Sequence, residues 1–460
     1  MSLLGKETTT LSWPDYRTVW RWHFYAGVFC VPFIVLLATS GGIYLFTPQI
    51  NAWLDRPYNR LSLTGPHMTA RAQVDAALHA VPGSTLSAYE LPRDQDDATR
   101  IIVKNRRERI RVYVHPETLA ILKIIPEEDR FTRMVFHFHG ELLMGNTGSV
   151  FVELAASWAI VMVVTGLYLW WPHDKRGFGG IVYPRLTLGS RGFWRDLHAV
   201  TGFWISLFVL FLLLTGLPWA KVWGEYFKEI RRLTGTAVVE QDWTVGAISR
   251  NTNQDPSEEH LAHTGQTIFP ANTGDLPLDN SPLDIFLPSV RALHLPPPVF
   301  IIPPSRPEGH WTAKSDTQNR PQRVKVMLDA TTGAILKREN FEDRHMLDRM
   351  IGFGVAAHEG QLFGWPNVVL GMFTAGGLLV VVTSGILMWW RRRSSGLLGA
   401  PPRTQTQPFS FGFIVLLLFF CFYLPLFAAS LASILLIEKL FIRWVPPLAH
   451  WLGLENQAGR

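Results

Sequence analysis

The feature that most constrains this chain is a long internal repeat that joins a histidine to an apolar span. One copy runs from His139 to Trp171 and the other from His358 to Trp390, and each ends in a Trp-Trp pair. In both copies a glycine follows the histidine at the same distance. Each copy contains an apolar stretch of about 20 residues, which is the length a helix needs to cross the bilayer core. The repeat therefore predicts a duplicated membrane unit with a histidine at one end of each copy.

Apolar runs along the chain predict a mainly α polytopic membrane protein with about five transmembrane helices. Hydrophobic residues make up 48% of the 460, which is typical of a membrane protein that also has sizeable aqueous parts. The two cysteines, Cys30 and Cys421, lie inside apolar runs and form neither a disulfide framework nor a metal motif. The expected order is the N-terminus with the first span (1–47), a soluble module (48–130), the second span (131–172), a loop (173–197), the third span (198–220), a second soluble module with a loop insertion (221–350), the fourth span (351–393), a loop (394–410), the fifth span (411–440) and a tail (441–460).

The two long polar segments are predicted to be small α+β modules. In the first, a helical pattern over 69–80 precedes short strand-like runs at 85–91, 100–104, 109–114 and 120–125. VMLDATTGAIL in the second segment resembles VYVHPETLAIL in the first, whereas 231–281 has little apolar periodicity and is expected to be loop.

Basic residues predict the orientation of the chain in the membrane. They are concentrated in the short loops 172–197 and 391–410, so these loops and the N-terminus are expected to be cytoplasmic. Both soluble modules and the tail would then lie in the periplasm of a bacterium. The fifth span is expected to be one tilted or kinked helix within 411–437 rather than a hairpin.

Four histidines occupy equivalent positions at the ends of the predicted spans. His23 and His198 are each followed at the same distance by a Ser/Thr-Gly step, and both begin spans that start in the cytoplasm. His139 and His358 begin spans that start outside. We therefore expect two pairs, His23 with His198 near the cytoplasmic face and His139 with His358 near the periplasmic face.

Facing imidazoles at membrane depth favour a haem with two axial histidine ligands. Ionisable residues are costly inside a membrane and mark functional sites, and nearby glycines let a flat, bulky group approach the helices. A structural role at a helix end is the simplest alternative for each histidine. A mononuclear metal site is less favoured, because Glu141 and Glu359 are the only carboxylates close to the outer histidines. Without a Cys-X-X-Cys-His motif, we expect about two non-covalent haem b groups per chain.

Other ionisable residues are secondary candidates. His137 lies two residues before His139, and residues so spaced face apart on a helix, so we do not expect one iron to bind both. His137 and His345 remain reserve ligands, and no further catalytic side chain is predicted. The basic run from Arg106 to Arg111 is interpreted as a solvated strand face, with an acidic ligand or lipid headgroups as the alternative.

Together these residues resemble the PepSY-associated transmembrane helix family of bacterial inner-membrane proteins over about residues 16–440. The resemblance rests on His23 with its Gly-rich helix, HGELLMGNTG with TGLYLWWP, LHAVTGFW around His198, LTGLPW, and HEGQLFGWPN with SGILMWWRRR. It implies that the soluble segments are PepSY modules. Leu119 stands where the second copy has Gly333, so the two turns can differ.

Some members of that family are similar to ferric-siderophore reductases that hold haem in the membrane and release iron in the periplasm. The resemblance implies an electron-transfer protein that moves electrons from a cytoplasmic or membrane donor to Fe(III) in a siderophore. The alternative is a periplasmic binding or regulatory module on a membrane anchor, without redox activity.

Other function classes fit the sequence less well. A transporter is a weaker alternative, because the spans show no broken-helix pair and few charged residues, among them Glu153. No Gly-rich nucleotide fingerprint stands between a predicted strand and helix, so direct use of NAD(P)H is not expected. The predicted surroundings of the protein are the lipid bilayer, and no nucleic-acid partner is expected.

Overall fold

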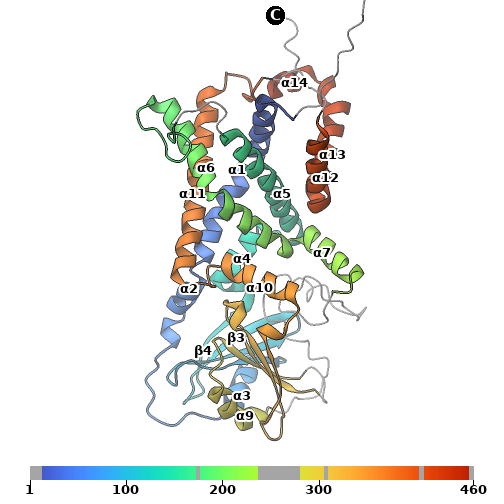
Figure 1. The fold of residues 1–460 in the computed structure, drawn as a ribbon. Coiled ribbons are helices and arrows are strands. Elements are labelled where there is room, and N and C mark those ends of the chain that lie inside the picture. Colours follow the sequence, from blue (N-terminus) through green and yellow to red (C-terminus); the bar gives the residue numbers. More distant parts are fainter. Residues whose placement is uncertain (1–12, 172–176, 237–279, 305–308, 403–408, 455–460) are drawn as a thin grey trace, which may run out of the picture. The chain divides into compact units, whose positions relative to one another are not determined.

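The computed structural model describes residues 13–171, 177–236, 280–304, 309–402 and 409–454 (Figure 1). It divides into two compact units. The helical unit comprises residues 1–41, 139–227 and 372–460, and the sheet unit comprises residues 42–138 and 228–371. Most of the loop predicted over 231–281 lies outside the described residues.

Five of the described helices are long and apolar enough to cross a membrane. They are α1 (Tyr16–Tyr44), α5 (Gly145–Trp170), α6 (Gly189–Gly216) extended by the 3-10 turn η3 (Leu217–Trp219), α11 (Trp365–Arg392), and α13 (Pro425–Leu440) extended through η6 (Ile442–Trp444). A sixth apolar helix, α12 (Phe411–Tyr423), is shorter. The third span begins earlier than the predicted residue 198, because its first two turns are polar and hydropathy does not register them.

Short helices precede two of the spans and carry two of the predicted histidines. α4 (Phe131–Glu141) comes before α5 and contains His139, and α10 (Met346–His358) comes before α11 and ends at His358. The sequence placed both histidines at the start of a continuous span. Between α4 and α5 the chain instead turns, and Leu142 and Leu143 adopt left-handed φ angles of 51° and 59° there.

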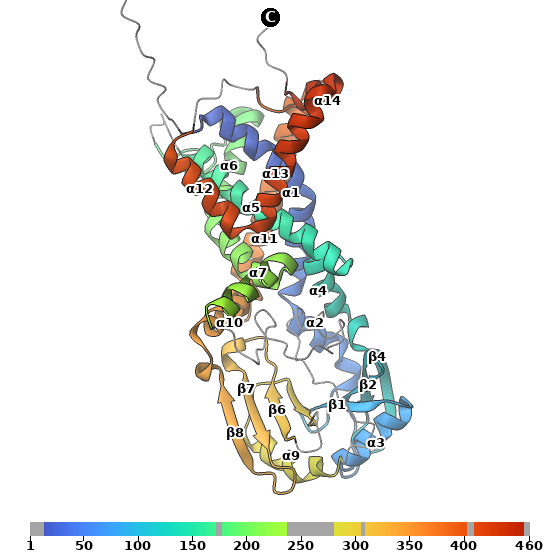
Figure 2. The same ribbon diagram turned by 90° about the vertical axis from the view of Figure 1, so that its right-hand side faces the viewer.

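α12 and α13 form a hairpin whose two ends lie near the beginning of α1 (Figure 2). Near the start of α12, Phe413 stacks on Trp22 of α1, with ring centroids 5.7 Å apart. Beyond α13, the short helix α14 (Pro446–Leu452) is followed by Gly453, whose carbonyl accepts a hydrogen bond from Arg21 of α1 at 2.9 Å. The chain therefore enters and leaves this hairpin at one end of the helical unit.

This hairpin differs from the predicted single span over 411–440 and from the predicted tail (441–460) on the side opposite the N-terminus. The break between the two helices falls at Leu424, whose backbone dihedral angles (φ −122°, ψ 84°) are not helical. Pro425 follows as the first residue of α13, a position where the N–H that proline lacks would have no partner within the helix. Both arms are apolar over most of their length, so hydropathy does not distinguish one kinked helix from two paired ones.

The sheet unit is built on one antiparallel sheet of eight strands in the order β4-β3-β2-β1-β5-β6-β7-β8 (Figures 1 and 2). The strands are β1 (Thr85–Glu90), β2 (Thr99–Asn105), β3 (Glu108–Val114), β4 (Ile121–Pro126), β5 (Val299–Ile302), β6 (Trp311–Ser315), β7 (Val324–Leu328) and β8 (Ile335–Asn340). The predicted strands of the first module are thus present. Instead of forming two separate sheets, the halves join where β1 pairs with β5, with Tyr89 opposite Ile301.

Two helices cover the same face of this sheet and form its core. α3 (Ala70–Ala80) supplies Val74 and Ala77, and α9 (Pro282–Ala292) supplies Phe286, all of them fully buried against strand residues. Burial of these apolar side chains from both halves in one cluster is the main stabilising contribution to the sheet unit.

The two halves of the sheet contain the same turn at equivalent places. The N–H of Leu119 donates to the carbonyl of His115 at 3.0 Å, and the N–H of Gly333 donates to that of Asp329 at 3.0 Å. Their φ angles are 61° and 69°. The turns therefore match, and Leu119 adopts the left-handed conformation that glycine adopts at less cost.

Shorter elements complete the described part of the chain. They are α2 (Thr47–Leu54), η1 (Arg56–Tyr58), η2 (Glu127–Asp129), α7 (Lys221–Leu233), η4 (Arg320–Gln322) and η5 (Phe341–Asp343).

Candidate functional site

Two of the predicted histidines meet inside the helical unit. His23 on α1 and His198 on α6 have ring centroids 6.4 Å apart, and their ring planes are nearly perpendicular at 89°. Two imidazoles that bind one metal through facing nitrogens have ring centres roughly 6 Å apart, because each metal–nitrogen bond is about 2 Å long. The separation of these two rings is therefore the one that His23 and His198 would have if both held a single metal.

A hydroxyl group on a neighbouring helix holds the His23 ring. Nδ1 of His23 lies 3.1 Å from Oγ1 of Thr165 on α5. The Thr165 hydroxyl donates its own hydrogen to the carbonyls of Val161 and Met162, both at 3.0 Å. Its oxygen is thus left to accept a hydrogen bond from the His23 ring.

His139 and His198 are held in the same way. Nδ1 of His139 lies 2.9 Å from Oγ of Ser40 on α1. Nδ1 of His198 lies 2.9 Å from the carbonyl oxygen of Val381 and 3.3 Å from Oγ of Ser384, both on α11. A carbonyl can only accept, so Nδ1 of His198 carries the hydrogen and Nε2 carries the lone pair that a metal requires.

A glycine follows each of these hydroxyl residues and lets the imidazole approach its helix closely. A Cβ atom added at Gly166 would lie 3.1 Å from Cε1 of His23. The corresponding distances to the other two rings are 3.1 Å for Gly41 and 3.4 Å for Gly385. These contacts explain why the sequence repeats a Ser/Thr-Gly step in the spans.

The remaining candidate histidines belong to the sheet unit. His358 is the last residue of α10. His137 is engaged elsewhere, because its Nε2 lies 2.7 Å from Oε2 of Glu128. His345 precedes α10 and its Nδ1 accepts a hydrogen bond from the N–H of Leu347, as a helix cap does. The two reserve ligands thus have local structural roles.

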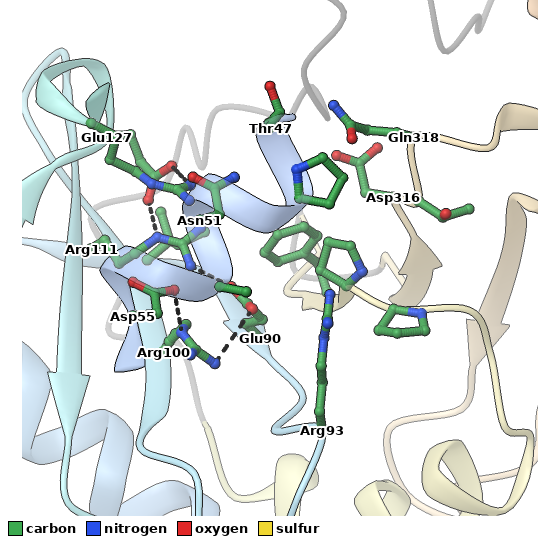
Figure 3. A pocket seen from close by; sticks show the side chains of 18 of the residues that line it. Thr47, Asn51, Asp55, Glu90, Arg93, Arg100, Arg111, Glu127, Asp316 and Gln318 are labelled. Atoms are coloured by element: carbon green, nitrogen blue, oxygen red, sulfur yellow. Dashed lines mark hydrogen bonds and ion pairs between the residues drawn. The ribbon is translucent and has the colours of Figure 1, made fainter. Parts of the chain in front are cut away.

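The sheet unit contains a cavity of about 400 Å³, within the usual range for ligand pockets. One wall comes from α2, β1, β2 and β3, and the other from the segments around β5 and after β6 (Figure 3). Apolar side chains such as Phe300 and Pro298 line it together with many polar ones. The charged lining residues are Asp55, Glu90, Arg93, Asp97, Arg100, Arg109, Arg111, Glu127, Arg130 and Asp316.

Most charges on the first wall of the cavity are paired. Arg111 is 4% exposed and bridges the carboxylates of Glu90 and Glu127. Arg100 lies 3.4 Å from Asp55 and 3.9 Å from Glu90. In Figure 3 these groups line the first wall, whereas Arg93 extends along the open space of the cavity. The pairing keeps the wall close to neutral while it offers many donors and acceptors.

The arginines of this wall also control the ionisation of a buried carboxyl group. Burial alone would raise the pKa of Glu127, but the guanidinium groups of Arg111 and Arg130 outweigh that effect and lower it to about 2. Glu127 is therefore ionised at neutral pH in spite of its burial.

A second cavity of about 140 Å³ adjoins the first and shares Thr47, Asn51, Arg130, Asp316 and Gln318 with it. Its lining also contains Glu359, the neighbour of His358, which lies 3.9 Å from Arg320. Two adjoining polar cavities thus lie in the sheet unit, and the smaller one is lined in part by the residue that follows His358.

The sequence did not predict either cavity. The one signal was the basic run ending at Arg111, which was interpreted first as a solvated strand face. Arg111 is instead buried, and its partners Glu90 and Glu127 lie on other elements, so no local motif reveals them.

Fold and sites define a multi-pass membrane protein with paired histidines in a helix bundle and a large antiparallel sheet. The family model of the PepSY-associated TM region matches residues 20–392, and the chain belongs to this family. The family resemblance drawn from the sequence is thereby confirmed. No curated protein matches the chain. The α12–α13 hairpin lies beyond the matched residues.

Proposed function

We propose that the protein is a di-haem b electron-transfer protein of the bacterial inner membrane that reduces Fe(III)-siderophore to Fe(II). Each iron takes up one electron from a donor on the cytoplasmic side or in the membrane, and the weakly held Fe(II) leaves the siderophore. Haem b supplies one-electron transfer when bound to paired histidines. The sheet unit would face the periplasm.

The observation that carries the proposal is the His23–His198 pair. Its ring separation suits two axial ligands of one iron, and hydrogen bonds on Nδ1 leave Nε2 of each ring to bind metal. Histidines with a purely structural role in helix capping need no such facing pair. The outer pair, His139 with His358, remains a prediction from the repeat.

A visible spectrum of the purified protein tests the proposal. We expect the red colour and sharp bands of low-spin haem, with two haems per chain. His23→Ala and His198→Ala should each remove one haem and leave the other. His79→Ala is the matched control, since that histidine is exposed and its Nδ1 bonds to the Asp75 carbonyl of its own helix α3. A colourless wild type from haem-replete cells would refute the proposal.

The cavity of the sheet unit is the proposed site for the ferric siderophore. It is large, open and lined by paired charges, so it can hold an oxygen-rich complex without a strong net charge. The adjoining cavity, lined in part by Glu359, supports an acceptor site close in the chain to the proposed ligand His358.

Gallium(III) complexes can test this site without any redox step, because Ga(III) is not reduced under these conditions. Calorimetry with a Ga(III)-hydroxamate should show binding that Arg93→Ala and Gln318→Ala weaken. Arg349→Ala, an exposed arginine on α10, should bind as wild type does. Equal binding by all four proteins would exclude this cavity as the site.

The cavity also favours a second candidate, a binding module on a membrane anchor without redox activity. None of the four proposed haem ligands lines this cavity, so it could bind a ligand without any haem. A protein that binds ligand in the cavity but purifies without haem would establish this alternative.

A further inference from the structure

We propose that Thr165, Ser40 and Ser384 are positioning residues that fix the tautomer and the ring plane of the proposed haem ligands. The inference rests on the proposed function and extends it to residues that do not touch iron. It is carried by the same arrangement occurring three times, on three different helix pairs.

The hydrogen bonds around each hydroxyl group have a fixed direction. Ser40 and Ser384 donate their hydroxyl hydrogens to backbone carbonyls one turn earlier, those of Leu36 at 2.8 Å and Val380 at 2.7 Å. Thr165 does the same. Because each hydroxyl hydrogen is used within its own helix, the oxygen faces the histidine as an acceptor.

A backbone carbonyl supports the same assignment for His198. His198 bonds to the carbonyl of Val381, three residues before Ser384. Because a carbonyl oxygen can only accept, Nδ1 of His198 carries the hydrogen, and its Nε2 keeps the lone pair available for a metal. His23 and His139 each have a hydroxyl oxygen at the same place on Nδ1.

The glycine that follows each hydroxyl residue sets how closely the histidine ring approaches the helix. A Cβ atom at position 166 would lie only 3.1 Å from Cε1 of His23, so the glycine leaves the ring room beside α5, and the Thr165 contact opposes its rotation. Outer partners of this kind orient metal-bound histidines and raise their basicity. The Ser/Thr-Gly step thus sets the orientation of the histidine ring and the basicity of its metal-binding nitrogen.

Electron paramagnetic resonance of the oxidised protein measures the ring angle. Perpendicular axial imidazoles give a strongly anisotropic low-spin signal with one large g value, whereas parallel rings give a rhombic signal. From the 89° between His23 and His198, we expect one strongly anisotropic signal in wild type. Thr165→Val keeps the side-chain shape but removes the acceptor, so this signal should shift towards rhombic.

The midpoint potential gives a second readout. A less basic ligand stabilises ferric iron less, so Thr165→Val and Ser384→Ala should raise the potential of the haem held by His23 and His198. Thr165→Ser should restore the wild-type value. Ser206→Ala is the matched control, because Ser206 bonds back to the Gly202 carbonyl at 2.6 Å like the others but is paired with no proposed ligand.

The glycine is tested separately. Gly166→Ala should displace the His23 ring and lower haem content, whereas Gly202→Ala, which meets no atom within 4 Å, should leave it unchanged.

The outcomes separate the two hypotheses. A wild type without haem refutes the proposed function and this inference together. A red wild type in which Thr165→Val and Ser384→Ala match Ser206→Ala in both signal and potential refutes the inference alone.

Discussion

The carboxylate of Glu153 accepts a hydrogen bond from the backbone N–H of Trp223 at 3.0 Å. Its other oxygen accepts one from the N–H of Val222 at 2.8 Å, and Ser149 accepts one from Lys221 at 3.2 Å. These N–H groups open helix α7, where no earlier turn supplies acceptors. A charged residue inside an apolar span is therefore explained by capping of another helix rather than by transport of a substrate.

Removal of this cap should destabilise the helical unit. Glu153 is only 2% exposed, so Glu153→Leu leaves two N–H groups without acceptors and should cost roughly 1–3 kcal/mol of unfolding free energy. Glu153→Gln keeps one acceptor oxygen and should cost less. Thermal unfolding in detergent measures the effect, with the exposed Glu225→Gln on α7 as control. Equal midpoints for Glu153→Leu and this control would contradict the capping role.

The hairpin of α12 and α13 predicts that both chain termini lie on one side of the membrane. The Arg21–Gly453 hydrogen bond joins the residue that follows α14 to the beginning of α1. A reporter that is active only in the cytoplasm should therefore give the same result at either terminus. A reporter after residue 130, in the sheet unit, should give the opposite result. Opposite results for the two termini would contradict the hairpin and support the single fifth span that hydropathy alone predicts.

Acid should weaken the sheet unit through Glu127. A carboxyl group whose pKa is lowered by folding stabilises the fold above its ordinary pKa of 4.5, and this contribution disappears as the pH falls towards the folded value of about 2. Glu127→Gln should lower the melting temperature at pH 7 and flatten its decline between pH 4.5 and 2. Glu108→Gln, an exposed change at the start of β3, should leave the wild-type pH profile intact. A Glu127→Gln profile parallel to wild type would show that other groups govern acid unfolding.

Apolar runs and the repeat were sufficient to predict the first four spans and to single out His23 and His198, because hydropathy and spacing are properties of consecutive residues. The joining of the two half-sheets was not predictable in this way. β1 and β5 pair through backbone hydrogen bonds, which carry no side-chain signature. The cavity was missed for a related reason, since Arg111 and its partner Glu90 come together only when separate strands pair.

The repeated turn offers a test of backbone strain in the sheet unit. Gly333 has a φ of 69°, and a Cβ atom there would lie 3.3 Å from Phe286. Gly333→Ala should therefore destabilise the protein by about 1–2 kcal/mol. Leu119→Gly relieves the same strain but loses the packing of Leu119 on the core, so its net effect should be small. Thermal unfolding measures the stability of both variants. An unchanged melting temperature for Gly333→Ala would mean that this turn accommodates alanine without strain.

The pairing of the four histidines can be tested by combining substitutions. If His139 and His358 bind one haem, each single alanine variant should lose one haem, and the double variant should lose no more. His23→Ala with His139→Ala takes one ligand from each proposed pair, so that variant should lose both haems. Pyridine haemochrome assays count the haem per chain in each protein. Loss of both haems in the His139/His358 double variant, or retention of one in the His23/His139 variant, would show that the ligands are paired differently from the order the repeat predicts.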